Sequence, residues 1–198
     1  MDWRDQTLEY YEENGKAFVE GTLTADMQDA RDRFLEKLPA QPYVLDFGCG
    51  SGRDTKAFMQ AGCRVDAVDG SETLCLKASE YTGIPVRQML FSDLKANAVY
   101  DGVWACASIL HLPKDELKTV LAKIKTALKQ GGILYTSFKY GTFEGMRNGR
   151  YFTDLTEKGL TELLQELPGL QLIETWITAD VRPGRAEEQW INILARRA

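Results

Sequence analysis

The sequence predicts an α/β fold: a doubly wound, mostly parallel sheet of seven strands that ends in a C-terminal antiparallel hairpin. Three observations predict it. Apolar strand patterns alternate with helical patterns along most of the chain, which is typical of right-handed crossovers. The segment 99–108, "VYDGVWACAS", is almost entirely apolar, as expected of a central parallel strand covered on both faces. Two strand patterns then follow each other near the C-terminus with no helix between them.

In the first half, a helical pattern over 25–38 places Met27, Ala30, Phe34 and Leu38 on one face. Pro39 and Pro42 separate it from the first strand. The elements expected next are strands over 43–48, 63–70 and 84–91 and helices over 51–62 and 71–83. Ser71 has the side chain and position of an N-cap for the second of these helices.

In the second half, Pro113 marks a helix start, and we expect Gly131 and Gly132 to end that helix before a strand over 133–138. A further helix starts near Thr156. The segments 170–181 and 188–197 form the closing hairpin, which makes one strand antiparallel.

Composition limits the classes of function. The 198 residues suit one domain, and the net charge of −5 with a pI near 5.1 gives no general attraction to nucleic acid or anionic membranes. No apolar run is long enough to span a bilayer, and we expect a cytoplasmic protein. The cysteines show no metal- or redox-motif spacing and are interpreted as reduced, buried side chains: Cys49, Cys63, Cys75 and Cys106. With one histidine, no metal site is predicted.

The stretch 43–54, "YVLDFGCGSGRD", places glycines at positions 48, 50 and 52 directly behind a buried strand. In a doubly wound sheet, ligands bind at the carboxyl ends of the strands, where such glycines let a cofactor approach the backbone. The spacing differs from the dinucleotide fingerprint G-x-G-x-x-G. Asp69 ends the second strand, 21 positions after Gly48, where a carboxylate can accept hydrogen bonds from ribose hydroxyls.

These motifs resemble the class I S-adenosylmethionine (SAM)-dependent methyltransferases. "VLDFGCGSGRD", "VDAVDGS", "FSDL" and "YDGVWACASILHLP" follow one another in the family's order over nearly the whole chain. The stretches "GCGSGRD" and "CRVDAVDGS" look most like the small tellurite-resistance-type branch. The resemblance implies a Rossmann-like methyltransferase fold in one domain. It divides into an N-terminal helical lid (1–38), a cofactor-binding core (43–138), and substrate loops with the closing hairpin (139–198).

The resemblance also implies roles for single residues. Asp46 would orient the glycine loop or reach the methionine amine, Asp69 would bind the ribose, and Asp93 and Leu94 would hold the adenine. The full set of cofactor-binding residues that it implies is Asp46, Gly48, Cys49, Gly50, Asp69, Gly70, Ser71, Asp93, Leu94, Ala107 and Ser108. The resemblance implies SAM as the cofactor and S-adenosylhomocysteine (SAH) as its product.

Methyl transfer by in-line displacement mainly requires that the acceptor be aligned with the activated methyl group. Few catalytic residues are therefore dictated by the sequence. The candidates are His111, which follows the fourth strand, and Tyr140, which follows the fifth. His111 would be a general base because its pKa is ordinarily near neutral, or else a helix-entry residue bonded to backbone. Tyr10 or Tyr11 of the N-terminal helix would contact the ligand or simply pack.

Two segments after the fifth strand carry a local basic cluster in an acidic protein. Arginine forks suit carboxylates and phosphates, so we expect these loops to bind a small anionic acceptor. The predicted substrate-binding residues are Lys139, Arg147, Arg150, Tyr151, Arg182 and Arg185. The alternative is that the arginines are solvated or pair with Glu144, Asp154 and Glu187.

Other functions remain open at this point. An RNA-modifying methyltransferase would use the arginine loops on RNA, although the acidic pI makes nucleic acid an unfavoured partner. A non-catalytic SAM-binding module would keep the glycine loop and Asp69. A nicotinamide oxidoreductase disagrees with the glycine spacing. The sequence is compatible with a monomer or a homodimer.

Overall fold

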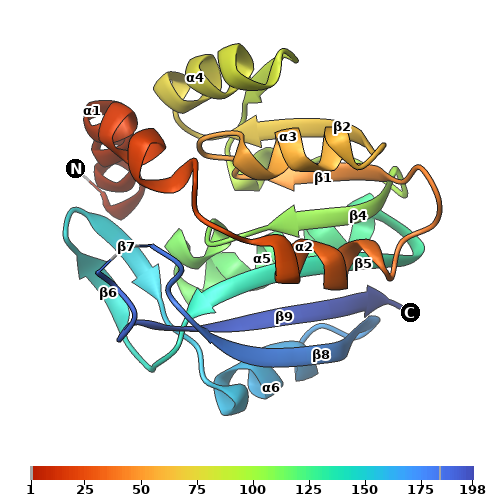
Figure 1. The fold of residues 1–198 in the computed structure, drawn as a ribbon. Coiled ribbons are helices and arrows are strands. Elements are labelled where there is room, and N and C mark those ends of the chain that lie inside the picture. Colours follow the sequence, from red (N-terminus) through yellow and green to blue (C-terminus); the bar gives the residue numbers. More distant parts are fainter. Residues whose placement is uncertain (1, 183) are drawn as a thin grey trace.

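The computed structural model describes residues 2–182 and 184–198. Its main sheet has seven strands in the order β3-β2-β1-β4-β5-β9-β8. Strand β9 runs antiparallel to both of its neighbours, while the pairs among β1 to β5 are parallel. The predicted mostly parallel sheet with a closing antiparallel hairpin is confirmed (Figure 1).

The predicted order of elements is confirmed in the first half of the chain. It holds α1 (Trp3–Thr22), α2 (Gln28–Leu35), β1 (Tyr43–Phe47), α3 (Arg53–Gln60), β2 (Arg64–Asp69), α4 (Glu72–Thr82) and β3 (Val86–Gln88). Ser71 is the N-cap of α4, because its hydroxyl accepts a hydrogen bond from the Leu74 N–H at 3.1 Å.

The second half differs from the prediction in two places. It holds η1 (Phe91–Asp93), β4 (Tyr100–Ala105), η2 (Ile109–His111), α5 (Lys114–Ala127), β5 (Leu128–Lys139), β6 (Glu144–Arg147), β7 (Arg150–Thr153), α6 (Glu157–Gln165), β8 (Leu170–Ala179) and β9 (Gln189–Arg197). Gly131 and Gly132 do not end helix α5; they lie inside β5, beside an irregular stretch of its pairing with β4. The segment after β5, expected to be a loop, contains the β6–β7 hairpin.

Alternate strand residues face two separate apolar clusters. Leu45 and Val103 pack against α5 and α6 on one face of the sheet. Val44 and Trp104, their neighbours in sequence, pack against Phe34 of α2 on the other face. Helix α2 therefore belongs to the core, as its predicted apolar face implied. Of the segment 1–38, it is α1 that lies over the carboxyl ends of the parallel strands, beside the β6–β7 hairpin (Figure 1).

Helix α1 is attached to the body by several hydrogen bonds. The Glu12 carboxylate accepts hydrogen bonds from the N–H groups of Glu72 and Thr73 at 2.7 and 3.1 Å, and so caps helix α4. Arg4 donates both hydrogen bonds of a bidentate pair to Glu116 of α5. The Thr7 hydroxyl accepts from the Tyr151 N–H at 3.0 Å. These contacts hold α1 against three different elements of the body.

Candidate functional site

A cavity of about 550 Å³ opens at the carboxyl edge of the sheet, between the body and α1. This volume lies within the usual range for small-molecule sites. Its wall combines the glycine loop after β1, the end of β2, the segment 89–92, the turn after β4, and residues of α1, β7 and the β8–β9 connection. The sheet edge predicted to bind a ligand is therefore hollow.

The glycine loop has a backbone that L-residues rarely adopt. Gly48, Gly50 and Gly52 have φ values of 85°, 55° and 77°. A Cβ atom at Gly50 would lie 3.0 Å from the Phe18 ring of α1. The glycines thus allow the sharp turn of the loop and the close approach of the lid helix.

Asp69 connects the end of β2 to this loop. One of its carboxylate oxygens accepts from the Gly50 N–H at 2.9 Å, and the other accepts from the Ser71 N–H at 3.0 Å. Burial raises the pKa of Asp69, while the backbone donors oppose that shift. Each oxygen has a further lone pair, and Asp69 and Gly70 both line the cavity. The carboxylate is therefore placed to accept hydrogen bonds from a ligand.

Beneath the loop, Asp46 is buried and accepts a hydrogen bond from the Thr55 hydroxyl at 2.5 Å. Burial, together with the nearby Asp54 carboxylate, raises the pKa of Asp46 to about 8. Asp54 behaves differently, because Arg31 and Arg53 pair with it at 2.8 and 2.6 Å and its pKa is lowered. The floor of the cavity therefore holds one charged carboxylate and one that tends to be neutral at pH 7.

The segment after β3 differs from the sequence prediction. Asp93 is exposed and Leu94 is buried in the core, and neither lines the cavity. The wall is formed instead by Met89, Leu90, Phe91 and Ser92. The 3₁₀ turn at 91–93 accounts for the difference, because it turns the chain away from the cavity after Ser92. The assignment of the adenine to Asp93 and Leu94 stays a prediction.

The turn after β4 lies where it was predicted. Ala107 has a φ of 49°, and its N–H donates to the Ser137 hydroxyl at 2.9 Å. Ser108 is buried and donates its hydroxyl proton to the Phe47 carbonyl at 2.7 Å. Both residues line the cavity, as does Cys49, whose thiol pKa is raised by burial. Ser71 does not line it, because its side chain caps α4.

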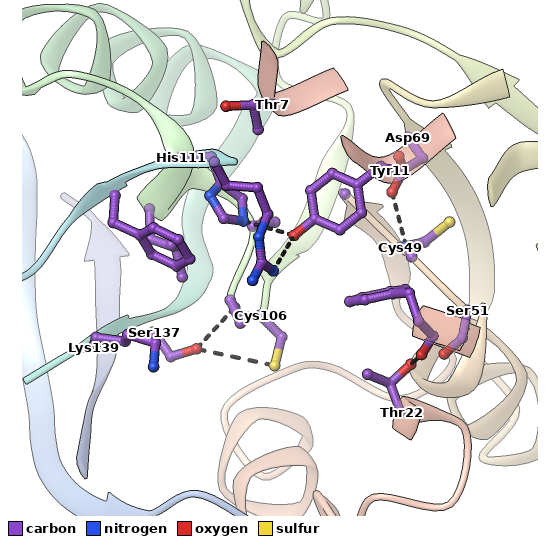
Figure 2. Close-up of a pocket in the computed structure, with 18 of the residues that line it drawn as sticks. Thr7, Tyr11, Thr22, Cys49, Ser51, Asp69, Cys106, His111, Ser137 and Lys139 are labelled. Atoms are coloured by element: carbon purple, nitrogen blue, oxygen red, sulfur yellow. Dashed lines mark hydrogen bonds between the residues drawn. The ribbon is translucent and has the colours of Figure 1, made fainter. Parts of the chain in front are cut away.

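His111 is buried at the wall and uses both ring nitrogens. Nδ1 lies 2.6 Å from the Tyr151 carbonyl oxygen, and Nε2 lies 2.8 Å from the Tyr11 hydroxyl. Burial, reinforced by the charges of Arg150 and Arg147, lowers the pKa of His111 to about 3. Figure 2 shows the Tyr11 hydroxyl pointing at the imidazole from the lid helix. His111 is thus neutral, and both of its ring nitrogens are engaged in hydrogen bonds, so neither is free to act as a general base.

Four of the five predicted cations pair with acids. Lys139 pairs with Glu188, Arg182 with Asp180, and Arg185 with Glu188 at 3.6 Å. Arg147 makes a bidentate pair with Asp154, at 3.1 and 2.8 Å. The alternative of internal pairing therefore holds for these four, although only the Asp154 partner was among those expected. All four also line the cavity.

Arg150 is the exception. Within residues 2–182 and 184–198, no carboxylate lies within salt-bridge distance of its guanidinium, and its buried Nε has no hydrogen-bond partner. The guanidinium lies 4.2 Å from the centre of the Tyr10 ring and 5.2 Å from that of Phe152. Its Nη1 donates a long hydrogen bond, 3.4 Å, to the Tyr11 hydroxyl. Arg150 is therefore a cation in the cavity wall whose guanidinium can still donate hydrogen bonds to a ligand.

Two predicted tyrosines do not reach the cavity. Tyr140 is exposed and donates a hydrogen bond to Glu157 at 2.8 Å, and its catalytic role stays a prediction. The Tyr151 side chain packs on Trp3 and donates to Glu144, so it does not face an acceptor; only its backbone carbonyl reaches the site, through His111.

Several cavity residues had no signal in the sequence. Phe18, Arg53 and Cys106 line the wall, but each matches an ordinary helix or strand pattern. The ion cluster of Arg31, Arg53 and Asp54 joins α2 to α3, which are separated by β1. Tyr11 was considered beside Tyr10, and only the docking of α1 shows which one faces the site.

The comparison with protein families agrees with the resemblance seen in the sequence. Residues 44–132 match the family described as "Methyltransferase domain". This segment is therefore similar to a methyltransferase domain. It contains the glycine loop, Asp69 and the turn after β4, and the lid helix and both substrate-side segments lie outside it.

Two curated relatives match part of the chain. The carboxy-S-adenosyl-L-methionine synthase of Vibrio atlanticus (strain LGP32) is 28% identical over 122 residues, which are 57% of this chain and 50% of the relative. The malonyl-acyl-carrier-protein O-methyltransferase of Enterobacter lignolyticus (strain SCF1) is 28% identical over 107 residues, 52% of this chain and 42% of the relative. The matched chain thus spans half or less of the length of these relatives.

Solved structures match the chain over nearly its whole length. The 1,6-didemethyltoxoflavin-N1-methyltransferase of Burkholderia thailandensis, crystallised with 1,6-didemethyltoxoflavin and SAH bound, is 25% identical with a TM-score of 0.77 and covers 96% of this chain and 84% of that one. The magnesium protoporphyrin IX methyltransferase of Synechocystis PCC 6803, with bound SAH, is 19% identical with a TM-score of 0.75, and all of both chains is covered. The chain therefore has the fold of these methyltransferases.

The residues of segment 44–132 fit SAM. One continuous cavity is lined by the glycine loop, by the Asp69 carboxylate and by the apolar segment 89–91. Each Asp69 oxygen accepts one backbone hydrogen bond and keeps a lone pair for a ligand. Within residues 2–182 and 184–198, no helix is long and apolar enough to cross a membrane. In the same part of the chain, no group of three histidine, cysteine or acidic residues is arranged to hold a metal ion.

Proposed function

We propose that the protein transfers the methyl group of SAM to a small anionic acceptor by in-line displacement. When bound, SAM supplies a methyl group already activated by its sulfonium. The observation that carries the proposal is Arg150, a cation without an acidic partner among the described residues, in the wall of a cavity that also contains the glycine loop. The neighbour crystallised with 1,6-didemethyltoxoflavin supports an acceptor of small size.

On the cofactor side, we assign the ribose to Asp69, because its carboxylate keeps free lone pairs at the cavity wall. Asp46 would face the methionine amine, whose positive charge would favour the ionised carboxylate. Gly48, Gly50 and the Ala107–Ser108 turn would lie along the methionine and ribose. The adenine would lie against Leu90 and Phe91 in place of Asp93 and Leu94, because only the former line the cavity.

On the acceptor side, Arg150 would bind the anionic group. A guanidinium between aromatic rings retains its charge and can present a fork of N–H donors to a carboxylate or phosphate. Lys139, Arg147, Arg182 and Arg185 would shape the cavity in their paired states and contribute less net attraction. The protein would thereby hold the acceptor in line with the methyl group and exclude water.

The test uses SAM carrying a labelled methyl group. The purified protein is incubated with cell extract, and small molecules are separated from RNA and protein. Label in the small-molecule fraction supports the proposal and delivers the acceptor for identification. Label in RNA or protein contradicts the small acceptor, and SAM binding without any labelled product indicates a non-catalytic SAM-binding module.

A matched pair of variants tests the anion site. Arg150→Met, which keeps the length and apolar contacts of the side chain, is expected to raise the acceptor KM at least about tenfold with an unchanged SAH Kd. Arg196→Met, an exposed arginine near the opposite end of β9, is the control. An unchanged KM in Arg150→Met would refute the anion site. Membership of the small tellurite-resistance-type branch stays a prediction from the motifs "GCGSGRD" and "CRVDAVDGS".

A further inference from the structure

The hydrogen bonds around His111 determine where the protons are. The Tyr151 carbonyl can only accept, so His111 Nδ1 must carry a proton. In the neutral ring Nε2 is then an acceptor, and the Tyr11 hydroxyl must donate to it across 2.8 Å. The tautomer of the imidazole and the direction of the tyrosine proton are thus both determined by one backbone carbonyl.

Tyr11 lines the cavity, and its oxygen keeps capacity to accept a hydrogen bond. Its hydroxyl donates to His111, and the only hydrogen bond that it accepts among the described residues is the long one from Arg150, at 3.4 Å. The ring is held from several sides, because its centre lies 5.2 Å from that of Phe18, 5.4 Å from that of Tyr10 and 5.6 Å from that of His111. A hydroxyl held in this way can accept a hydrogen bond from a ligand and has no proton to donate to it.

We propose that Tyr11 is a catalytic residue whose oxygen accepts a hydrogen bond from the N–H or O–H group of the methyl acceptor, and that His111 is a positioning residue that orients the Tyr11 hydroxyl. A lone pair of the acceptor nitrogen or oxygen would form the new bond to the methyl carbon while the bond from that carbon to the sulfonium breaks, which leaves SAH; the acceptor proton is then released to water. The inference rests on the proposed function. Arg150, next to Tyr11, binds the anionic group of the same acceptor, so the two contacts fix both the position and the rotation of the nucleophile. The acceptor class is therefore an anion that carries a hydroxyl or amino group.

This arrangement makes methyl transfer depend on the lid helix. Tyr11 comes from α1, His111 from η2 after β4, and Arg150 from the start of β7. They meet only while α1 lies on the body, where Glu12 caps α4 and Thr7 binds the backbone of β7. Closure of the cavity and completion of the catalytic site are then one event.

The test compares three variants with labelled SAM and the small-molecule fraction of cell extract as the acceptor source. Tyr11→Phe removes the hydroxyl and keeps the ring. His111→Phe keeps an aromatic ring but removes the nitrogen that accepts the hydrogen bond of the Tyr11 hydroxyl. Tyr81→Phe removes a hydroxyl from α4, away from the cavity, and is the control. SAH binding is measured in parallel by calorimetry.

Tyr11→Phe is expected to lower kcat about tenfold or more while the SAH Kd stays within about threefold of wild type. His111→Phe should also lower kcat without abolishing it, and Tyr81→Phe should match wild type. If Tyr11→Phe keeps the wild-type kcat, or if its kcat and SAH affinity fall in the same proportion, Tyr11 serves only to close the lid and the inference is wrong. If wild type labels no small molecule, the proposed function fails and the inference with it.

Discussion

Gly48 and Ser108 approach each other so closely that a Cβ atom at position 48 would lie 2.5 Å from the Ser108 Cβ. Gly48 also has a φ of 85°, a conformation that costs an alanine about 1–2 kcal/mol. The Ser108 side chain cannot move aside freely, because its hydroxyl is bonded to the Phe47 carbonyl. The first glycine of the loop is therefore constrained by conformation and by space.

We predict that Gly48→Ala lowers the free energy of unfolding by about 2–5 kcal/mol, the sum of backbone strain and overpacking. Gly83→Ala is the matched control, since Gly83 has a nearly identical φ of 82° but no atom within 4 Å of the added methyl group. It should lose only the strain, about 1–2 kcal/mol. Urea unfolding measures both values; equal losses would show that Ser108 does not restrict position 48.

A second prediction concerns Asp46 and pH. Its folded pKa of about 8 lies above its unfolded value near 3.8, so between these values the unfolded chain ionises while the folded protein retains the proton. This group therefore destabilises the cofactor-free protein increasingly as pH rises from about 4 to 8. Asp46→Asn should be the more stable protein at pH 8 by at least about 1 kcal/mol, with a smaller gain at pH 5. Urea unfolding at both pH values measures it, and a pH-independent difference would contradict the shift.

A third prediction distinguishes the two assignments of the adenine side. Phe91→Leu should raise the SAH Kd about tenfold, because an aromatic ring at the cavity wall is lost where a base would stack. Asp93→Asn should leave the Kd within about twofold, because that side chain is exposed and lies outside the wall. Calorimetric titration with SAH measures both. The opposite ranking would restore the assignment made from the sequence.

A fourth prediction uses the single histidine of the chain. In nitrogen-detected NMR spectra, His111 should remain in the neutral Nδ1–H form from pH 8 down to pH 5, since burial lowers its pKa to about 3. The unfolded histidine takes up a proton near pH 6.5, so this group destabilises the protein as pH falls below that value. A titration midpoint above pH 6 would show an imidazole accessible to solvent, and would favour its use as a general base.

The sequence predicted what local patterns determine. Strand order along the chain, the glycine loop, Asp69 and the Ser71 cap all depend on neighbouring residues. It missed what depends on contacts between distant segments. The pair of Lys139 with Glu188, the hydrogen bond from Tyr140 to Glu157 and the hydrogen bond between Tyr11 and His111 all join residues that are far apart in the sequence. No spacing rule relates residues 100 positions apart.

The antiparallel setting of β9 has a consequence for acceptor choice. Because β9 lies between β5 and β8, residues 180–182 and 184–188 fall between two adjacent strands of the sheet, and Asp180, Val181, Arg182, Arg185 and Glu188 line the cavity beside the glycine loop. The segment 139–153 leaves the same edge after β5. Either segment can change in length or composition without altering the loop that faces the cofactor. On the proposed function, these two segments would set the acceptor while the glycine loop and Asp69 hold the donor, and we expect that grafting the two segments between relatives exchanges acceptor preference.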